Sequence, residues 1–592
     1  MRSSLTLVPS GIGAAILFSA IIGVANLIWL AIDQQPQPVL DPYIEAIWNL
    51  TRGYGEKEVW EFPRLMIWSG LAPRVPLYQI LSSPFVAVLG FDVDSILALN
   101  TLFMLVLGVA TYRIAQRIVN SRFAVLATVL VVTLPIVTEL SRLVRPHALM
   151  PAVVALVLWQ CLRTIEQASV KNAWMLAIAV FSAFCIHASS IYLIAVPIAS
   201  VFIYVGEKIA PPDTSVIARF IFAIKHPVFS KGVIPGFLTI TLMIVIWMII
   251  QWDFYVDMQQ VIREIFEPQA VQWQLEQRSF ANLNVLNTVL LVISAVLVLI
   301  DRSKNPTSAM ARLMLFWLLS MFIAFHLFLK IGYWQQFSGS VSLIAVMCAK
   351  GLSLIATAKN KIVGRVFLLI VVLATVQSYA TTAWGVFTVE GLPCGSKNPA
   401  CEDGLTDLRS NRPLRKEWPI ADIIAPLFSQ GSCSKAMQCT VTLVSFRSQY
   451  FSHELFQHTL VREFDYISRT GEHPFYPTRN VFFSRVGEGG EGILNWLYSD
   501  YVYYLLNAKR QPFASKLIDY GAVELEVPIV HFIESQVSQT NGLFKKIVEV
   551  PLPNGLYAIV AKRVEAVHSI DDVLDGMKLK DHIRQRMLQS IQ

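Results

Sequence analysis

The chain has 592 residues, of which 55% are hydrophobic and only 15% charged, whereas soluble globular proteins average about 25% charged residues. An ordinary soluble enzyme is therefore excluded. Of the 48 basic and 41 acidic residues, 45 lie after residue 386, so we predict a polytopic α-helical membrane domain over 1–386 and an extracytoplasmic α+β domain over 387–592. The net charge of +7 does not indicate a nucleic-acid partner, because Lys and Arg fall mostly in short loops between apolar stretches.

Eleven apolar stretches are long enough to be predicted as spans of a hydrocarbon core about 30 Å thick. The first, Gly11 to Ile32, contains one polar amide, Asn26, and reads as a permanent span rather than a cleaved signal peptide. The eleven stretches are 11–32, 95–112, 123–139, 148–162, 173–187, 191–205, 233–251, 285–300, 313–329, 338–356 and 366–382.

The placement of basic residues predicts which loops face the cytoplasm. If the amino terminus is inside, every inner loop carries Lys or Arg, as the positive-inside rule requires. The inner basic residues are Arg113, Arg117, Arg122, Arg163, Lys171, Lys208, Arg219, Lys225, Lys231, Arg302, Lys304, Lys359, Lys361 and Arg365. An odd number of spans then places the tail outside, and we expect a bacterial inner membrane with a periplasmic tail.

The outer loop 33–94 includes a further apolar segment, Leu77 to Phe91. This segment is shorter than a span and contains Pro84, so we predict a helix that lies at the outer membrane surface. Counting it as a span would reverse the sidedness of every later loop.

After Trp384 the pattern becomes that of a small α+β domain. Short strands are predicted at 440–446 and 481–486, a hairpin at 547–550 and 556–562, and helices at 501–507 and from Ser569 onward. Four cysteines in this tail indicate one or two disulfides in an oxidising compartment. A zinc site is the alternative, although the spacings of these cysteines match no common zinc pattern. They are Cys394, Cys401, Cys433 and Cys439.

Two acidic residues in the first outer loop are candidates for chemistry. Asp41 precedes Pro42 and lies one helical turn from Glu45, so both carboxylates can share one face. The structural alternative is that Asp41 caps a helix in which Pro42 is the first residue.

Several cations are predicted at the same outer surface, where the charge bias should make them rare. The loop Ser141-Arg142-Leu143-Val144-Arg145-Pro146-His147 holds two arginines between two spans. They point either to a substrate phosphate or to lipid headgroups. Further residues of this surface are Arg74, Tyr78, Glu139, His187, Lys330 and Tyr333.

The order of these motifs resembles the polyprenyl-phosphate-sugar-dependent glycosyltransferases of the C-type fold, such as protein mannosyltransferases and the aminoarabinose transferases of lipid A. Asp41 stands where that family keeps its catalytic aspartate. Arg74-Val75-Pro76-Leu77-Tyr78 resembles its proline-rich segment, Arg145-Pro146-His147 its "RPY" turn, and Gly332-Tyr333 loosely its "RY" pair. One position of this chain departs from the family pattern. Many relatives keep an acidic residue two positions before the arginine of the turn, where this chain has Leu143.

The resemblance implies an enzyme that transfers a sugar from a polyprenyl-phosphate donor to an acceptor glycan, lipid or protein at the outer face. Asp41 would be the catalytic base, and Arg74, Arg145, His147 and Lys330 would hold the donor phosphate. Glu45, Tyr78, Glu139, His187 and Tyr333 would support them. No cofactor is required, and a divalent metal is possible.

Two other functions remain at this stage. The missing acid at Leu143 is compatible with a catalytically silent scaffold that acts through its tail. A transporter would place ionisable residues near mid-bilayer, and the spans hold few, with His326 the clearest.

Overall fold

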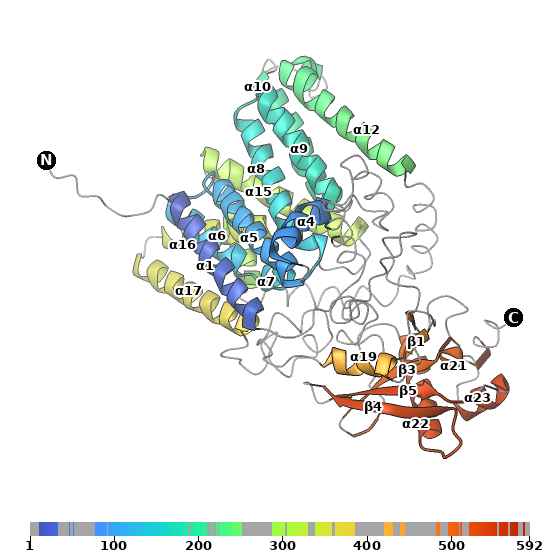
Figure 1. The fold of residues 1–592 in the computed structure, drawn as a ribbon. Helices are drawn as coiled ribbons and strands as arrows, with labels where there is room; N and C mark the ends of the chain where they lie inside the picture. The colour runs from blue at the N-terminus through green and yellow to red at the C-terminus, as the bar shows by residue number, and fades with distance from the viewer. Residues whose placement is uncertain are drawn as a thin grey trace. The chain divides into compact units, whose positions relative to one another are not determined.

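The computed structural model describes 11–32, 77–90, 93–186, 190–209, 224–250, 287–301, 305–328, 338–357, 361–384, 419–429, 439–444, 481–485, 495–507, 509–511, 520–552, 556–565 and 569–577, with a few isolated positions between them. The chain divides into two compact units (Figure 1). The first comprises 1–31, 42–402 and 409–412, and the second 32–41, 403–408 and 413–592. Because 385–418 lies outside the described residues, the predicted domain boundary at 386 and 387 stays a prediction.

The first unit is helical, and ten of the eleven predicted apolar stretches each coincide with one helix, while the stretch 123–139 is divided between two. The helices within the predicted apolar stretches are α1 (Gly11–Ile32), α5 (Val93–Ala115), α6 (Ser121–Val132), α7 (Pro135–Ser141), α8 (Met150–Glu166), α9 (Val170–Ile186), α10 (Ser190–Ile209), α12 (Ile234–Ile250), the helix Asn287–Ile300, α15 (Pro306–Phe328), α16 (Val341–Ala356) and α17 (Lys361–Trp384). Between them lie α4 (Leu77–Leu89), the 3-10 turn η2 (Pro146–Ala148) and the π-helical turn η3 (Phe229–Val233).

These helices are those of a polytopic membrane protein. Among the described residues, five helices are long and apolar enough to cross a membrane by themselves, or up to six if a bent pair forms one span. Others are apolar but shorter, including α9 and the helix Asn287–Ile300. The number of eleven spans therefore stays a prediction. The prediction of a polytopic helical membrane unit is confirmed. The segment predicted to lie at the membrane surface forms α4, with Pro84 inside it.

The stretch predicted as one span over 123–139 is broken. Its two parts, α6 and α7, meet at an angle of 56°. Leu134 adopts an extended backbone conformation, φ −60° and ψ 136°, before Pro135 opens α7, because a proline disfavours the helical conformation of the residue before it. The break redirects the chain, and α7 delivers it to the turn 142–147.

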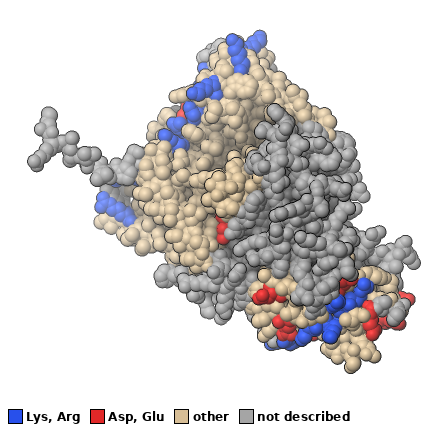
Figure 2. Space-filling view, viewed as in Figure 1, with Lys and Arg blue, Asp and Glu red and all other residues tan. Residues whose placement is uncertain are grey.

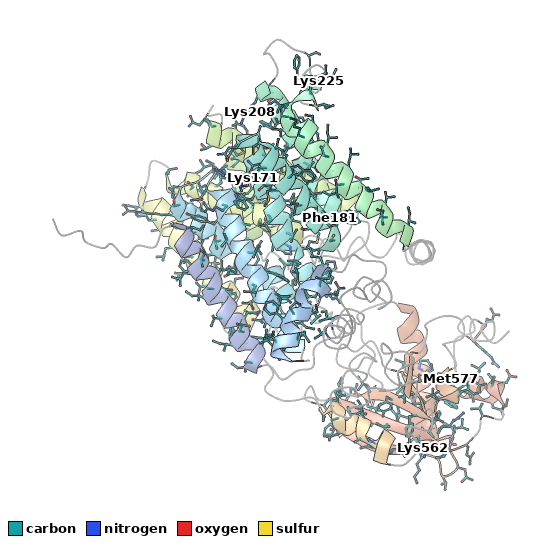
Figure 3. The ribbon with its side chains drawn as sticks, turned by 45° about the horizontal axis from the view of Figure 1, so that its top comes forward. Lys171, Phe181, Lys208, Lys225, Lys562 and Met577 are labelled. Atoms are coloured by element: carbon teal, nitrogen blue, oxygen red, sulfur yellow. The ribbon has the colours of Figure 1, made fainter. Side chains whose placement is uncertain are left out.

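Contacts of the last residues of α8 define one end of the helical unit. At this end, Arg117 pairs with Glu166 at 3.0 Å, and the Lys208 ammonium donates to the backbone carbonyls of Ile165 and Glu166. Figure 2 shows Lys and Arg along one rim of this unit, above a mostly uncharged flank, and Figure 3 places Lys208 and Lys225 together at its upper end. The turn 142–147 lies between α7 and α8, and α8 runs from this turn to Glu166 at the rim.

Small residues allow close helix packing in this unit. A Cβ atom added to Gly232 would lie 2.6 Å from Ala173 Cβ, and one added to Gly236 would lie 2.7 Å from Ala177 Cβ. The two glycines are four residues apart, as are the two alanines, so the surfaces match over one turn. This is the packing that membrane helices use when no hydrophobic effect drives their association.

The second unit contains a five-stranded mixed sheet with strand order β2-β1-β3-β5-β4. The strands are β1 (Cys439–Leu443), β2 (Val481–Arg485), β3 (Tyr501–Leu506), β4 (Phe544–Pro551) and β5 (Tyr557–Arg563). β1 pairs in parallel with β2 and β3, whereas β5 pairs antiparallel with β3 and β4.

Helices cover both faces of this sheet (Figure 1). Val502, Tyr504 and Leu506 of β3 pack into a core with α21 (Asn495–Tyr498), α22 (Tyr520–Val537) and α23 (Ile570–Gly576). On the other face, the Tyr503 hydroxyl donates to the Ile423 carbonyl of α19 (Ile420–Ser429) at 3.2 Å.

The prediction of a helix over 501–507 is wrong, because these residues form the central strand β3. All six of its side chains are buried, so the sequence shows a continuous apolar run instead of the alternation of a half-buried strand. Such a run does not distinguish a buried strand from a helix by its periodicity.

The other strand predictions are confirmed, and so is the start of the last helix. The hairpin begins at Phe544, earlier than predicted, and its register shifts at an irregularity between Lys546 and Val548. Ser569 caps α23 by accepting from the Asp572 N–H at 3.2 Å. Of the four tail cysteines, Cys439 begins β1, while Cys394, Cys401 and Cys433 lie outside the described residues, so the disulfide prediction is untested.

The predicted orientation can be tested by cysteine labelling in spheroplasts. Lys545 is an exposed residue of β4, and Lys171 is an exposed residue near the basic rim. We expect Lys545→Cys to react with a membrane-impermeant thiol reagent and Lys171→Cys to react only after permeabilisation. The parental protein gives the background from its own cysteines. Labelling of Lys171→Cys alone in intact spheroplasts would contradict the orientation.

Candidate functional site

The predicted site residues fall into two groups. Four of them are described: Tyr78 in α4, Glu139 in α7, Arg145 before η2 and His147 within it. The others, Asp41, Glu45, Arg74, His187, Lys330 and Tyr333, lie outside the described residues. Their predicted roles are therefore untested.

The turn between α7 and α8 is built from consecutive short backbone hydrogen bonds. The Arg142 N–H donates to the Glu139 carbonyl at 2.9 Å, and the Arg145 N–H donates to the Leu143 carbonyl at 3.0 Å. Arg145 itself is extended, with φ −149° and ψ 145°, because Pro146 follows it. The turn thus fixes the Cα position of each of its basic residues.

Protein covers the ionisable side chains of this region. Arg145 is 9% exposed, His147 7% and Glu139 3%, and each of them takes part in at least one interaction. A cation that binds lipid headgroups at the membrane surface would be open to its surroundings. The burial therefore favours the other sequence interpretation, an enclosed site for an anion.

Asn100 of α5 connects this turn to α4. Its side-chain amide donates to the carbonyls of Ser141 and Leu143, at 3.2 and 3.0 Å, and its oxygen accepts from the Tyr78 hydroxyl at 3.1 Å. The Tyr78 side chain is buried, and this burial raises the pKa of its phenol above the ordinary value. The two motif segments are thus joined by neutral hydrogen bonds.

Arg142 ties the same turn to the two terminal helices of the unit. Its Nε donates to the Asn26 side chain of α1 at 2.7 Å, and its Nη1 donates to the Ala383 carbonyl of α17 at 2.8 Å. Its guanidinium carbon lies 3.9 Å from the centre of the Trp29 ring. Because the side chain is fully buried, Arg142 is a structural clamp, and of the two arginines in the loop only Arg145 remains a candidate ligand.

Sequence reasoning missed the roles of Asn100 and Arg142. A signal existed for the amides, because Asn26 and Asn100 are polar side chains inside apolar stretches, and such residues are costly unless they are paired. The partner of each could not be read from the sequence, since Asn100 and Ser141 are 41 residues apart and Arg142 and Ala383 are 241 apart.

A metal site does not emerge from the described part of the chain. No three His, Cys, Asp or Glu side chains within it are placed to hold a metal ion. The prediction that a divalent metal is possible is therefore untested.

Residues 73–230 match the family described as dolichyl-phosphate-mannose-protein mannosyltransferase. The resemblance to C-type glycosyltransferases is thereby confirmed over this segment, which holds Tyr78, Asn100 and the whole turn 141–147. Asp41, Lys330 and Tyr333 lie outside the match. A comparison with curated protein sequences finds no match.

Several solved structures are similar over most of the chain at low identity. The archaeal oligosaccharyltransferase AglB from Archaeoglobus fulgidus, in complex with an inhibitory peptide and a dolichol-phosphate, is 12% identical with a TM-score of 0.47, covering 94% of this chain and 74% of its own. The oligosaccharyltransferase of the same organism with Zn and sulfate is 12% identical, TM-score 0.41, over 92% and 79%. The mycobacterial arabinofuranosyltransferase AftD is 13% identical, TM-score 0.47, over 93% and 40%.

The clamp made by Arg142 predicts a loss of stability when it is removed. Arg142→Met keeps much of the volume but leaves the Asn26 oxygen and the Ala383 carbonyl without this donor. A hydrogen bond to a charged group contributes about 1.5–3 kcal/mol, so we expect a clearly lower melting temperature in detergent. The matched control is Arg163→Met, which removes a contact with the Trp159 ring at 5.3 Å, worth about 1 kcal/mol or less. Equal melting temperatures for the two variants would contradict the clamp.

Proposed function

We propose that this protein transfers a sugar from a polyprenyl-phosphate donor to an acceptor at the outer face of a bacterial inner membrane. The observation that carries the proposal is the junction of the two family-like segments: Tyr78 and the turn of Arg145 meet through Asn100, inside the segment that matches the family. The acceptor is a glycan, a lipid or a protein, and the tail domain lies in the periplasm.

The reaction needs a base on one side of the sugar and cations on the other. An acceptor hydroxyl attacks the anomeric carbon, its proton passes to a carboxylate, and the bond from that carbon to the phosphate oxygen breaks. A hydroxyl is a weak nucleophile, so a carboxylate within about 3 Å of it assists attack. Asp41 is the proposed base, and Glu45 and Glu139 are the acids that could assist it.

The leaving lipid phosphate gains one negative charge as the bond breaks. Preorganised cations in an enclosed site stabilise such a charge better than water does, because they need no reorganisation during the reaction. Arg74, Arg145, His147 and Lys330 are the proposed phosphate ligands, while Tyr78, His187 and Tyr333 support them. Among these, Arg145 and His147 are held on the buried turn described above.

One observation keeps a second function open. Leu143, where many relatives carry an acid, is 3% exposed, so this position packs an apolar side chain in the unit and offers no second carboxylate. A silent scaffold would bind partners through its tail and would not turn over donor. The Asp41 experiment below separates the two functions, because a scaffold has no turnover to lose.

Replacing the base should remove turnover without unfolding the protein. We expect Asp41→Asn to lower the release of polyprenyl phosphate from lipid-linked sugars by about 10²-fold or more, the usual scale for the loss of a general base. The control is Asp301→Asn, since Asp301 accepts from the Ser308 hydroxyl at 2.6 Å beside α15 and has no proposed part in the reaction. If Asp41→Asn releases polyprenyl phosphate at the parental rate, the mechanism is wrong and Glu45 or Glu139 becomes the residue to test.

Replacing a phosphate ligand should weaken the binding of polyprenyl phosphate, because the ligand contacts the phosphate in the ground state and in the transition state. We expect Arg145→Gln to raise the Kd for polyprenyl phosphate in lipid nanodiscs by about 10-fold or more, the equivalent of one lost hydrogen bond to a charged group. Arg163→Gln, in the last turn of α8, is the matched control and should leave this Kd unchanged. Equal affinities of the two variants would show that Arg145 does not contact the phosphate.

A further inference from the structure

Asn100 is the polar residue on which the turn and α4 both depend. It is 1% exposed and lies within the apolar helix α5. A buried amide of this kind is costly unless its hydrogen-bonding groups are paired. Its three described hydrogen bonds use both N–H groups and the oxygen, so the amide is fixed in one orientation.

The two carbonyls that Asn100 holds lie on either side of Arg142 in the sequence. The Leu143 carbonyl accepts from the Asn100 amide and also from the Arg145 N–H, each at 3.0 Å. A shift of Asn100 would therefore move the peptide group to which the backbone of Arg145 is attached. The Asn100 oxygen also accepts from the Tyr78 hydroxyl at 3.1 Å, so the same amide contacts both the turn and α4.

We propose that Asn100 is a positioning residue for the phosphate-binding turn: it sets the place of Arg145 through the carbonyls of Ser141 and Leu143 and keeps it in register with Tyr78. The inference rests on the proposed function, because it assumes that Arg145 binds the donor phosphate. It adds a residue that neither touches the donor nor carries charge. Its contribution to binding acts entirely through the geometry of the turn.

A double-mutant cycle tests this dependence with polyprenyl phosphate as the probe. Asn100→Leu removes the amide at similar volume, and we expect it to raise the Kd for polyprenyl phosphate in nanodiscs by about 10-fold. If Asn100 acts through Arg145, the double variant Asn100→Leu, Arg145→Gln should bind no more weakly than Arg145→Gln alone. Residues that act as a unit are non-additive in this way, whereas independent residues give additive losses.

Asn172 provides a matched control for the loss of a buried amide. It is 3% exposed, and its side-chain amide donates to the Gln167 carbonyl at 2.9 Å beside the basic rim. Asn172→Leu should lower the melting temperature in detergent to a similar extent but leave the Kd unchanged. If the Asn100→Leu effect came only from a general loss of stability, both variants would show the same change in Kd.

A milder variant keeps the test decisive if Asn100→Leu does not fold. Tyr78→Phe deletes the hydroxyl that orients Asn100 and leaves the ring, whose centre lies 6.2 Å from that of Phe103. We expect a smaller rise in Kd, in the same direction, that also disappears in the Arg145→Gln background. An unchanged Kd in Tyr78→Phe, or additive losses in either cycle, would overturn the positioning role.

The failure of this inference can be told apart from the failure of the proposed function. If Arg145→Gln binds polyprenyl phosphate as the parent does, the phosphate site itself is wrong. If Arg145→Gln weakens binding while the Asn100 effect is absent or additive, the phosphate site stands and the positioning role alone is rejected.

Discussion

The structure of the helical unit depends on the pairing of backbone groups where a span is broken. A membrane offers no water to satisfy free carbonyl and amide groups, so irregular backbone survives there only when protein groups bind it. The chain leaves helical geometry at Leu134 and again between Ser141 and Pro146. Asn100 binds two carbonyls of the second irregular segment, and Arg142 anchors that segment to α1 and α17.

The same pairing explains why basic residues collect at an unexpected place. Arg142 is bound by neutral oxygens and an aromatic ring, so its presence in a predicted outer loop reflects a structural need. Arg145 is held by its backbone N–H, which donates to the Leu143 carbonyl at 3.0 Å, and its side chain is the candidate ligand of an anion. A turn fixed in this way can present a cation in a constant position, which electrostatic stabilisation of a leaving group requires.

Much of the helical unit could be predicted from the sequence, because long apolar stretches have few alternatives in a membrane protein. The break at Leu134 could not, although Pro135 was visible, since neighbouring helices often accommodate a proline within a span. In the tail, the hairpin and the cap at Ser569 follow local rules, whereas β3 does not, because burial on both faces removes the alternation that identifies strands. The site was predicted through its ionisable residues, and the amide that joins them was missed because its contacts are distant in sequence.

The proposed role of the turn 142–147 in binding the phosphate of a polyprenyl lipid can be tested by an experimental structure. The full chain would be solved in a lipid nanodisc with bound polyprenyl phosphate. We expect phosphate density within hydrogen-bond distance of the Arg145 guanidinium, about 3 Å, at the end of the unit where Tyr78 and Asn100 meet the turn. Phosphate density at the opposite end, beside Arg117 and Lys208, would contradict it.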